Sequence, residues 1–105
     1  MTCKHLVTAL FSAAAAFGQP ACSQAADAEL GRNLTANCAA CHGTNGVSAG
    51  GAIKSLAGDD KDYFVAQMKA FKEGKREATI MHQLAKGYTD AEVAALGDFF
   101  AAQKK

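Results

Sequence analysis

The sequence predicts a small all-α protein, and three observations support this prediction. Stretches 30–38, 64–71 and 93–100 carry apolar side chains three or four residues apart, a spacing that places them on one face of a helix. No stretch alternates between apolar and polar residues convincingly enough to predict a strand. The chain has 105 residues, which is room for one domain at most. We therefore expect three to five short helices in a single unit.

Residues 1–25 have the features of an export signal. Lys4 starts a short basic segment, an apolar run follows at 6–17, and a small-x-small cleavage motif occupies 23–25. These features predict a cleaved signal peptide and a mature domain at 26–105, exported to the periplasm of a bacterium. The apolar run is shorter than the roughly 20 residues that cross a bilayer, so we expect no membrane insertion after cleavage.

A lipoprotein attachment site at Cys22 is the alternative interpretation of this segment. The residues before it, 19–21, lack the leucine that such sites usually carry, which favours the cleaved signal. Cleavage would remove Cys3 and Cys22 and leave two cysteines. It would also remove Lys4 from the eleven Lys and Arg residues, so that ten remain against ten Asp and Glu. This balance gives no indication of nucleic-acid or membrane binding, and we predict neither.

The first helix of the mature domain is expected to start after Asp27, a favourable N-cap residue. Leu30, Leu34 and Cys38 recur every four residues and form one apolar stripe. Gly31 interrupts the helix at a cost of roughly 1 kcal/mol relative to alanine, which favours a packing role. We expect it to let a second helix approach closely.

The stripe ends in the sequence Cys38-Ala39-Ala40-Cys41-His42. The two thiols and the imidazole share one side of a helical turn, because residues three and four positions apart are neighbours. Cys-x-x-Cys-His is the attachment motif for c-type haem, in which the thiols form thioether bonds and the imidazole binds the iron. We therefore predict one covalently bound haem c on Cys38 and Cys41, with His42 as an axial iron ligand.

Two other uses of these cysteines remain open. A dithiol redox centre would keep Cys38 and Cys41 as free thiols, and a zinc site would have to recruit His42 and His82, which is a poor set. Haem also suits the size of the domain, since a core of about 80 residues is marginal and the macrocycle would supply apolar surface. We expect the protein without haem to be largely unfolded.

The glycine-rich stretch 43–58 is expected to form a loop beside the haem, with Ile53 and Leu56 turned inward. It does not have the pattern of a phosphate-binding loop, since no strand precedes it and no Gly-Lys-Ser/Thr closes it. Asp59 or Asp60 then caps a second helix that carries the apolar stripe 64–71.

Gly74 is expected to end that second helix, and a short third helix is expected at 79–86. The segment 89–92 has the pattern of a capping box and predicts the start of the last helix. The buried side of this helix carries the apolar residues between 93 and 100. Gly97 interrupts the last helix as Gly31 interrupts the first, which again favours a packing role. We expect the first and last helices to cross at these two glycines.

The second axial position on the iron has several candidates. Met81 follows a polar segment, where a loop can present its sulfur to the haem, whereas Met68 belongs to an apolar helical stripe typical of a core residue. We predict Met81 as the ligand, and His82, Met68 or an open position remain alternatives. Methionine opposite His42 raises the reduction potential, whereas an open position would permit ligand binding or peroxidase-like chemistry.

The haem motif and the stretch 79–90 resemble the class I cytochrome c family. Together with 56–58 and 67–71, they are most similar to the small single-haem cytochrome subunit of flavocytochrome c sulfide dehydrogenase. The resemblance covers the mature domain and implies a few helices wrapped around one haem, the first and last crossing near glycine and aromatic residues. It also implies His42 and Met81 as the axial iron ligands.

The resemblance further implies an electron-transfer protein that carries one electron at a time, as the cytochrome subunit or acceptor of a flavin-containing sulfide dehydrogenase. A free-standing soluble periplasmic cytochrome that delivers electrons to a terminal oxidase or another reductase is the alternative. The expected partner is a redox protein, with a flavoprotein subunit as the specific candidate. The sequence contains no nucleophile–base pair and no carboxylate dyad with suitable spacing, so we do not expect an enzyme.

Lys54 is a departure from the family pattern. Relatives often have a proline there, which shapes the loop whose backbone accepts a hydrogen bond from the proximal imidazole. We expect a less rigid loop at this position, with a lower stability or a shifted reduction potential.

Basic residues outnumber acidic ones between positions 69 and 86. The five basic residues are Lys69, Lys72, Lys75, Arg76 and Lys86, and the two acidic ones are Glu73 and Glu77. A basic margin beside Met81 would steer an acidic redox partner. An ordinary solvated helix face is the alternative, since most charged runs are of that kind.

Overall fold

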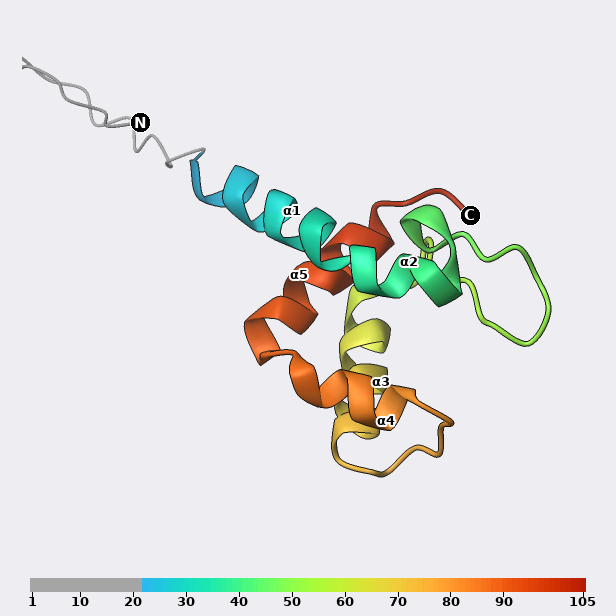
Figure 1. Ribbon diagram of the computed structural model, residues 1–105. Helices are drawn as coiled ribbons and strands as arrows, with labels where there is room; N and C mark the ends of the chain where they lie inside the picture. Colours follow the sequence, from blue (N-terminus) through green and yellow to red (C-terminus); the bar gives the residue numbers. More distant parts are fainter. Residues whose placement is uncertain (1–21) are drawn as a thin grey trace, which may run out of the picture.

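The computed structural model describes residues 22–105, and the predicted signal segment lies outside the described residues except for its last four positions. The described part is helical and contains no strand, which confirms the predicted all-α class (Figure 1). Residues 22–105 form five α-helices: α1 (Cys22–Leu34), α2 (Ala36–His42), α3 (Lys61–Lys72), α4 (Met81–Leu84) and α5 (Asp90–Ala101). Two 3₁₀ turns, Thr44–Gly46 and Ala85–Gly87, follow α2 and α4.

Helix α1 begins earlier than the sequence analysis predicted. It starts at Cys22, so Asp27 lies inside the helix and the prediction of Asp27 as its N-cap was wrong. The residues just before Asp27 include two alanines, the strongest helix formers, and nothing among them stops a helix. The predicted cleavage point therefore falls within the helix of the full-length chain, and the boundary between signal and domain remains a prediction.

A break at Thr35 separates α1 from α2, where the apolar stripe predicted one continuous helix. The Thr35 hydroxyl donates a hydrogen bond of 2.6 Å to the Arg32 carbonyl, and this local bond competes with the regular helical pattern. The Thr35 carbonyl then accepts from the backbone N–H groups of Cys38 and Ala39, which starts the new helix. As a result α2 leaves the line of α1 (Figure 1).

Helices α1 and α5 cross closely at Gly31, as predicted. A Cβ atom on Gly31 would lie 2.6 Å from the carbonyl oxygen of Ala95, so only glycine allows this approach. The predicted partner, Gly97, was wrong: a Cβ there would meet Lys61 of α3 at 3.1 Å. Residues 95 and 97 are about 200° apart around a helix, so they cannot face the same neighbour.

The core lies between α3 and α5. Phe64 and Met68 on α3 pack against Val93, Leu96 and Phe100 on α5, and all five side chains are buried. The rings of Phe64 and Phe100 are 5.4 Å apart between centroids in a tilted arrangement, a favourable geometry for an aromatic pair. The expectation that Met68 is a core residue is confirmed.

The helix ends follow the predicted local signals. Asp60 caps α3, since its carboxylate accepts a 3.0 Å hydrogen bond from the Tyr63 backbone N–H. Thr89 and Glu92 form both bonds of a capping box at the start of α5. Gly74 follows α3 with a φ of 70°, a left-handed conformation that terminates the helix.

Helix α4 is shorter than predicted. It has four residues and continues as the 3₁₀ turn to Gly87, which was the predicted end. The two residues before it do not adopt helical structure, and Ile80 has a φ of −138°. The segment therefore places Met81 on the first turn of α4, directly after irregular backbone.

Candidate haem site

The predicted haem residues converge on one cavity of about 790 Å³. Cys38, Cys41 and His42 reach it from α2, and Met81 reaches it from α4. These four positions are separated by up to 43 residues in the sequence, and the packing of α3 against α5 brings their segments to one place. The structure thus brings together the full set of side chains that the sequence analysis predicted.

The two cysteines lie one turn apart on α2 and form no disulfide with each other. Cys38 is half-buried and packs against the core, whereas Cys41 is exposed at the mouth of the cavity. Burial raises the pKa of the Cys38 thiol, so this thiol is held protonated at neutral pH. Because neither sulfur atom is in a disulfide, both are available for thioether bonds to a group in the cavity.

His42 is oriented by a backbone carbonyl. Its Nδ1 atom lies 2.6 Å from the carbonyl oxygen of Lys54, and because a carbonyl can only accept, Nδ1 must donate the proton. The other ring nitrogen, Nε2, then keeps a free lone pair, which is the form that binds a metal. Lys54 is the acceptor position predicted from the sequence, and the expected hydrogen bond that orients the His42 ring is present.

Met81 and His82 differ in their surroundings. Met81 is half-buried and lines the same cavity as His42. His82 lies in a separate, open hollow with Arg76 and Thr79, and its Nδ1 atom is buried without a hydrogen-bond partner among the described residues. Met68 also borders the cavity but is 95% buried within the core. Of the three candidates, Met81 combines access to the cavity with a position on a short, irregular segment.

The walls of the cavity suit a large apolar group. Leu56, Phe64 and Phe71 form part of the wall and pack on the core. Three large aliphatic side chains at the cavity remain about half exposed: Ile53 (45%), Ile80 (54%) and Leu84 (45%). Side chains of this kind are stabilised when an apolar surface covers them. A thioether-linked, axially ligated macrocycle fits both the donor set and this wall.

Leu56 and Ile53 are turned inward as predicted: Leu56 packs on the core, and Ile53 lines the cavity. Tyr63 on α3 lines the same cavity and is 44% exposed. A non-protein group that fills the cavity would cover this wall and explain the exposure of Ile53 and Tyr63.

The loop after His42 is fastened at its base. The Gly46 carbonyl accepts hydrogen bonds from the Ser55 hydroxyl (2.7 Å) and the Leu56 backbone N–H (2.8 Å). Gly46 has a φ of 77°, and a Cβ atom there would lie 2.8 Å from the Phe100 ring. Glycine therefore lets the base of the loop pack on the core. The second half of the loop then places Lys54 next to His42.

The contacts of the Lys54 side chain at this site were not predicted from the sequence. The ammonium of Lys54 lies 2.5 Å from a carboxylate oxygen of Asp59 and 4.7 Å from the centre of the Tyr63 ring. Asp59 had been considered only as a helix cap, a role that Asp60 takes. No periodic spacing links these three positions, so the sequence held no signal for the contact.

Most of the basic residues between 69 and 86 have partners. Lys75 and Lys69 lie 2.6 and 3.9 Å from Glu73, and the hydrogen bond from Lys75 lowers the pKa of the Glu73 carboxyl. Lys72 donates to the Tyr88 carbonyl, and Arg76 bonds to a neighbouring amide and lies over an aromatic ring. This pairing favours an ordinary solvated surface over a strong steering patch.

Two other features, a metal-ion site and a membrane span, are absent from the described residues. Within 22–105, no three His, Cys, Asp or Glu side chains gather as potential ligands of a metal ion. Haem iron, in contrast, needs only two protein ligands. No helix in the same range is both long and apolar enough to cross a membrane.

Comparison with known proteins identifies the family. The Cytochrome c family model matches residues 28–103. A cytochrome subunit of sulfide dehydrogenase from Chlorobaculum tepidum is 39% identical over 70 residues, which are 67% of this chain and 63% of that protein. Cytochrome c-554(548) of Halomonas halodenitrificans is 30% identical over 83 residues, covering 76% of this chain and 100% of that protein.

Other relatives are longer than the matched region. Cytochrome c4 of Pseudomonas aeruginosa is 38% identical over 80 residues, which are 76% of this chain and 40% of that protein. The chain thus spans less than two thirds of this relative and of the sulfide dehydrogenase subunit. The family-model match at 28–103 nevertheless includes every residue that lines the haem cavity, from Leu34 to Glu92. The chain belongs to the cytochrome c family, whose members carry covalently attached haem c and transfer electrons.

Proposed function

We propose that this protein carries one electron at a time on a haem attached through Cys38 and Cys41, with His42 and Met81 as the axial ligands. The observation that supports this assignment is the convergence of these four side chains on one cavity of about 790 Å³. A bound haem supplies one-electron chemistry at its iron. With both axial positions filled, the chain serves as a carrier and binds no substrate at the metal.

The protein residues set the conditions for this transfer. The Nδ1–H group of His42 donates a hydrogen bond to the Lys54 carbonyl. This bond fixes the orientation of the ring and leaves the lone pair on Nε2 free. A thioether ligand from Met81 favours the reduced state and raises the potential relative to a second histidine. The apolar wall around Leu56 and Phe64 limits access of water and has the same effect on the potential.

We further propose that the electron donor is a dehydrogenase in the bacterial periplasm, with a flavoprotein subunit as the specific candidate. One relative is named as the cytochrome subunit of a sulfide dehydrogenase, and another, from Stutzerimonas stutzeri, as a thiosulfate dehydrogenase electron acceptor. Export through the predicted signal at residues 1–25 supports the compartment. A free-standing cytochrome is the second candidate, because the relative from Halomonas halodenitrificans matches over its full length.

The experiment that tests the haem assignment compares Cys38→Ala and Cys41→Ala with the unaltered protein after expression with a cytochrome c maturation system. Haem staining after denaturing electrophoresis should show one haem in the unaltered chain, a strongly reduced signal in each single variant and none in the double variant. Retention of stained haem by the double variant would contradict covalent attachment at these residues.

The axial methionine is tested by Met81→Ala, with His82→Ala as its matched control. The ferric Met81→Ala protein should lose the near-infrared absorption band of methionine–iron ligation, and its reduced form should bind carbon monoxide readily. His82→Ala should keep the band and exclude carbon monoxide. If His82 were the ligand, the unaltered protein would lack this band, and His82→Ala rather than Met81→Ala would bind carbon monoxide.

A further inference from the structure

The carbonyl that orients His42 belongs to a loop without an intrinsically rigid residue at that point. The only proline of the chain is Pro20, so no proline ring restricts the backbone near Lys54. The hydrogen bonds at the base of the loop involve Gly46, Ser48 and Ser55. Beyond that base, Gly50 and Gly51 have positive φ values and open space around them. The tip of the loop therefore adds flexibility to the segment that leads to Lys54.

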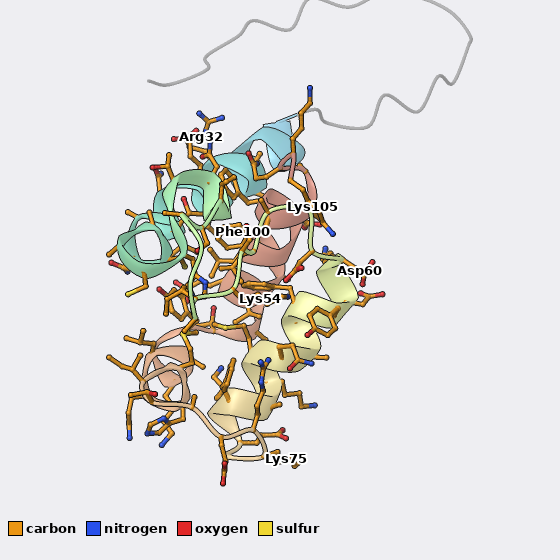
Figure 2. The ribbon with its side chains drawn as sticks, turned by 90° about the vertical axis from the view of Figure 1, so that its right-hand side faces the viewer. Arg32, Lys54, Asp60, Lys75, Phe100 and Lys105 are labelled. Atoms are coloured by element: carbon orange, nitrogen blue, oxygen red, sulfur yellow. The ribbon has the colours of Figure 1, made fainter. Side chains whose placement is uncertain are left out.

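The side chain of Lys54 fastens this segment to α3. Its ammonium pairs with Asp59 at 2.5 Å; the Asp59 side chain is 14% exposed and the Lys54 side chain 50%, so solvent screens this pair in part. The same ammonium lies 4.7 Å from the centre of the Tyr63 ring, within the range of a cation–π contact. Figure 2 shows Lys54 between α2 and the end of α3 that lies next to Asp60.

Both partners of the ammonium are themselves fixed. Tyr63 lies on the first turn of α3, where its backbone N–H donates the capping bond to the Asp60 carboxylate, and the Asp59 backbone N–H donates to the Leu56 carbonyl at 3.1 Å. A cation held between two fixed groups restricts the backbone of its own residue. The carbonyl of Lys54 is part of that backbone and is the acceptor for His42.

We propose that Lys54 is a positioning residue for the haem: the clamp of its ammonium between Asp59 and Tyr63 holds the carbonyl that accepts the His42 Nδ1 proton. This proposal rests on the assignment of His42 as an axial ligand. A well-formed bond at Nδ1 increases the electron density at Nε2 and stabilises the oxidised iron, which lowers the reduction potential. Loosening the clamp therefore raises the potential and exposes the Nδ1 proton to solvent.

A simple charge effect predicts the opposite sign. Removing the positive charge of Lys54 from the edge of the cavity would by itself favour the oxidised, more positive haem and lower the potential. Lys54→Met is therefore a decisive variant, because positioning and charge move the potential in opposite directions.

The test uses the haem-loaded protein and two measurements. In the reduced, diamagnetic state, NMR follows the exchange of the His42 Nδ1 proton with deuterated water, and redox titration gives the potential. Lys54→Met should accelerate the exchange by about tenfold, the combined size of a partly screened ion pair and a cation–π contact. Its potential should rise. Lys54→Arg, which can pair with Asp59 and stack on Tyr63, should keep both values.

Two further variants complete the design. Asp59→Asn removes the anionic partner and keeps Lys54, so it should also accelerate the exchange, and it replaces Lys54→Met if that variant retains no haem. Lys61→Met is the matched control. It also removes an ammonium from an ion pair near the start of α3, but that ammonium pairs with Asp98 on α5 at 2.7 Å. It should leave the exchange rate of the His42 proton unchanged.

Three results would overturn the proposal. One is unchanged proton exchange in both Lys54→Met and Asp59→Asn, another is a lower potential in Lys54→Met, and the third is equal acceleration in Lys61→Met. Failure of the underlying haem assignment is recognised separately, since the unaltered protein would then carry no haem or show no His42 ligation in the same spectra.

Discussion

The two irregular segments that reach the cavity differ in how they are held. The loop on the His42 side is fastened by backbone bonds at Gly46 and by the Lys54 side chain. The segment on the Met81 side is joined to the end of α3 by backbone bonds from Lys75 and Arg76 to the Ala70 carbonyl. Beyond that point it is held by two long side chains, since Lys72 donates to the Tyr88 carbonyl and Arg76 donates to Gln67, both at 2.5 Å. Figure 2 places Lys75 at the far end of α3 from Asp60, where this second segment begins.

The difference indicates unequal resistance to opening. Backbone bonds within a packed loop are lost only when the core around Phe100 is disturbed, whereas bonds from long side chains are lost with a single rotamer change. We therefore expect the Met81 side to open first and the His42 side to remain ligated.

Loss of haem should remove the support of both segments. The Cys38→Ala/Cys41→Ala protein should be largely unfolded, because exposed apolar residues such as Ile80 and Leu84 lose the surface that would cover them. Far-ultraviolet circular dichroism should show loss of most of the helical signal relative to the haem-loaded protein. A native helical signal with a cooperative thermal transition would show that α3 and α5 fold without the cofactor.

Gly46→Ala should break the His42 side from its base. The new Cβ atom would lie 2.8 Å from the Phe100 ring in a backbone conformation that disfavours alanine, so we expect a loss of about 3 kcal/mol in the free energy of unfolding. Gly50→Ala is the control, because φ is also positive there but no atom lies within 4 Å. It should cost about 1 kcal/mol. Equal losses in denaturant titrations would contradict a role for the contact with Phe100.

Lys72→Met should loosen the Met81 side alone. Its ammonium bonds to the Tyr88 carbonyl and is partly exposed, so its loss should cost about 1 kcal/mol after screening. Added imidazole should then displace methionine from the oxidised iron with an affinity about fivefold higher than in the unaltered protein. Lys69→Met, which loses only an exposed contact of 3.9 Å, should bind imidazole as before. Equal affinities in all three proteins would contradict the role of Lys72.

Salt should have the smallest effect. Because Glu73 neutralises part of the basic margin around Lys69 and Lys75, the rate of electron transfer to a redox partner should change less than about threefold from low to high ionic strength. Stopped-flow measurements over a salt series test this expectation. A decrease of tenfold or more would indicate that the basic margin does steer the partner.

The local chemistry of this protein could be predicted from its amino-acid residues alone. The haem motif at 38–42, the cap at Asp60 and the capping box at Thr89 each depend on residues within one helical turn of one another. Such interactions form wherever the segment is helical, and they could be predicted without knowing what packs against it. The all-α class follows from the same periodicity, and the expectation of one covalent haem follows from the motif.

Contacts that depend on which neighbour a side chain faces could be known only from the packing of the helices. Gly31 and Gly97 carry the same sequence signal, yet one meets α5 and the other meets α3. Met81 and His82 are adjacent in sequence, yet only Met81 lines the cavity of His42. Whether two side chains share a surface depends on the rotation and crossing of helices, which are set by packing across the whole core.

The contact between Lys54 and Asp59 is the clearest case of this kind. The sequence located Lys54 behind His42 and indicated a less rigid loop, but the loop is held by an ion pair and an aromatic ring instead of a proline. That pairing exists only because the loop folds back over the start of α3. Local sequence chemistry therefore determined which groups are present, and tertiary packing determined which of them act on the haem site.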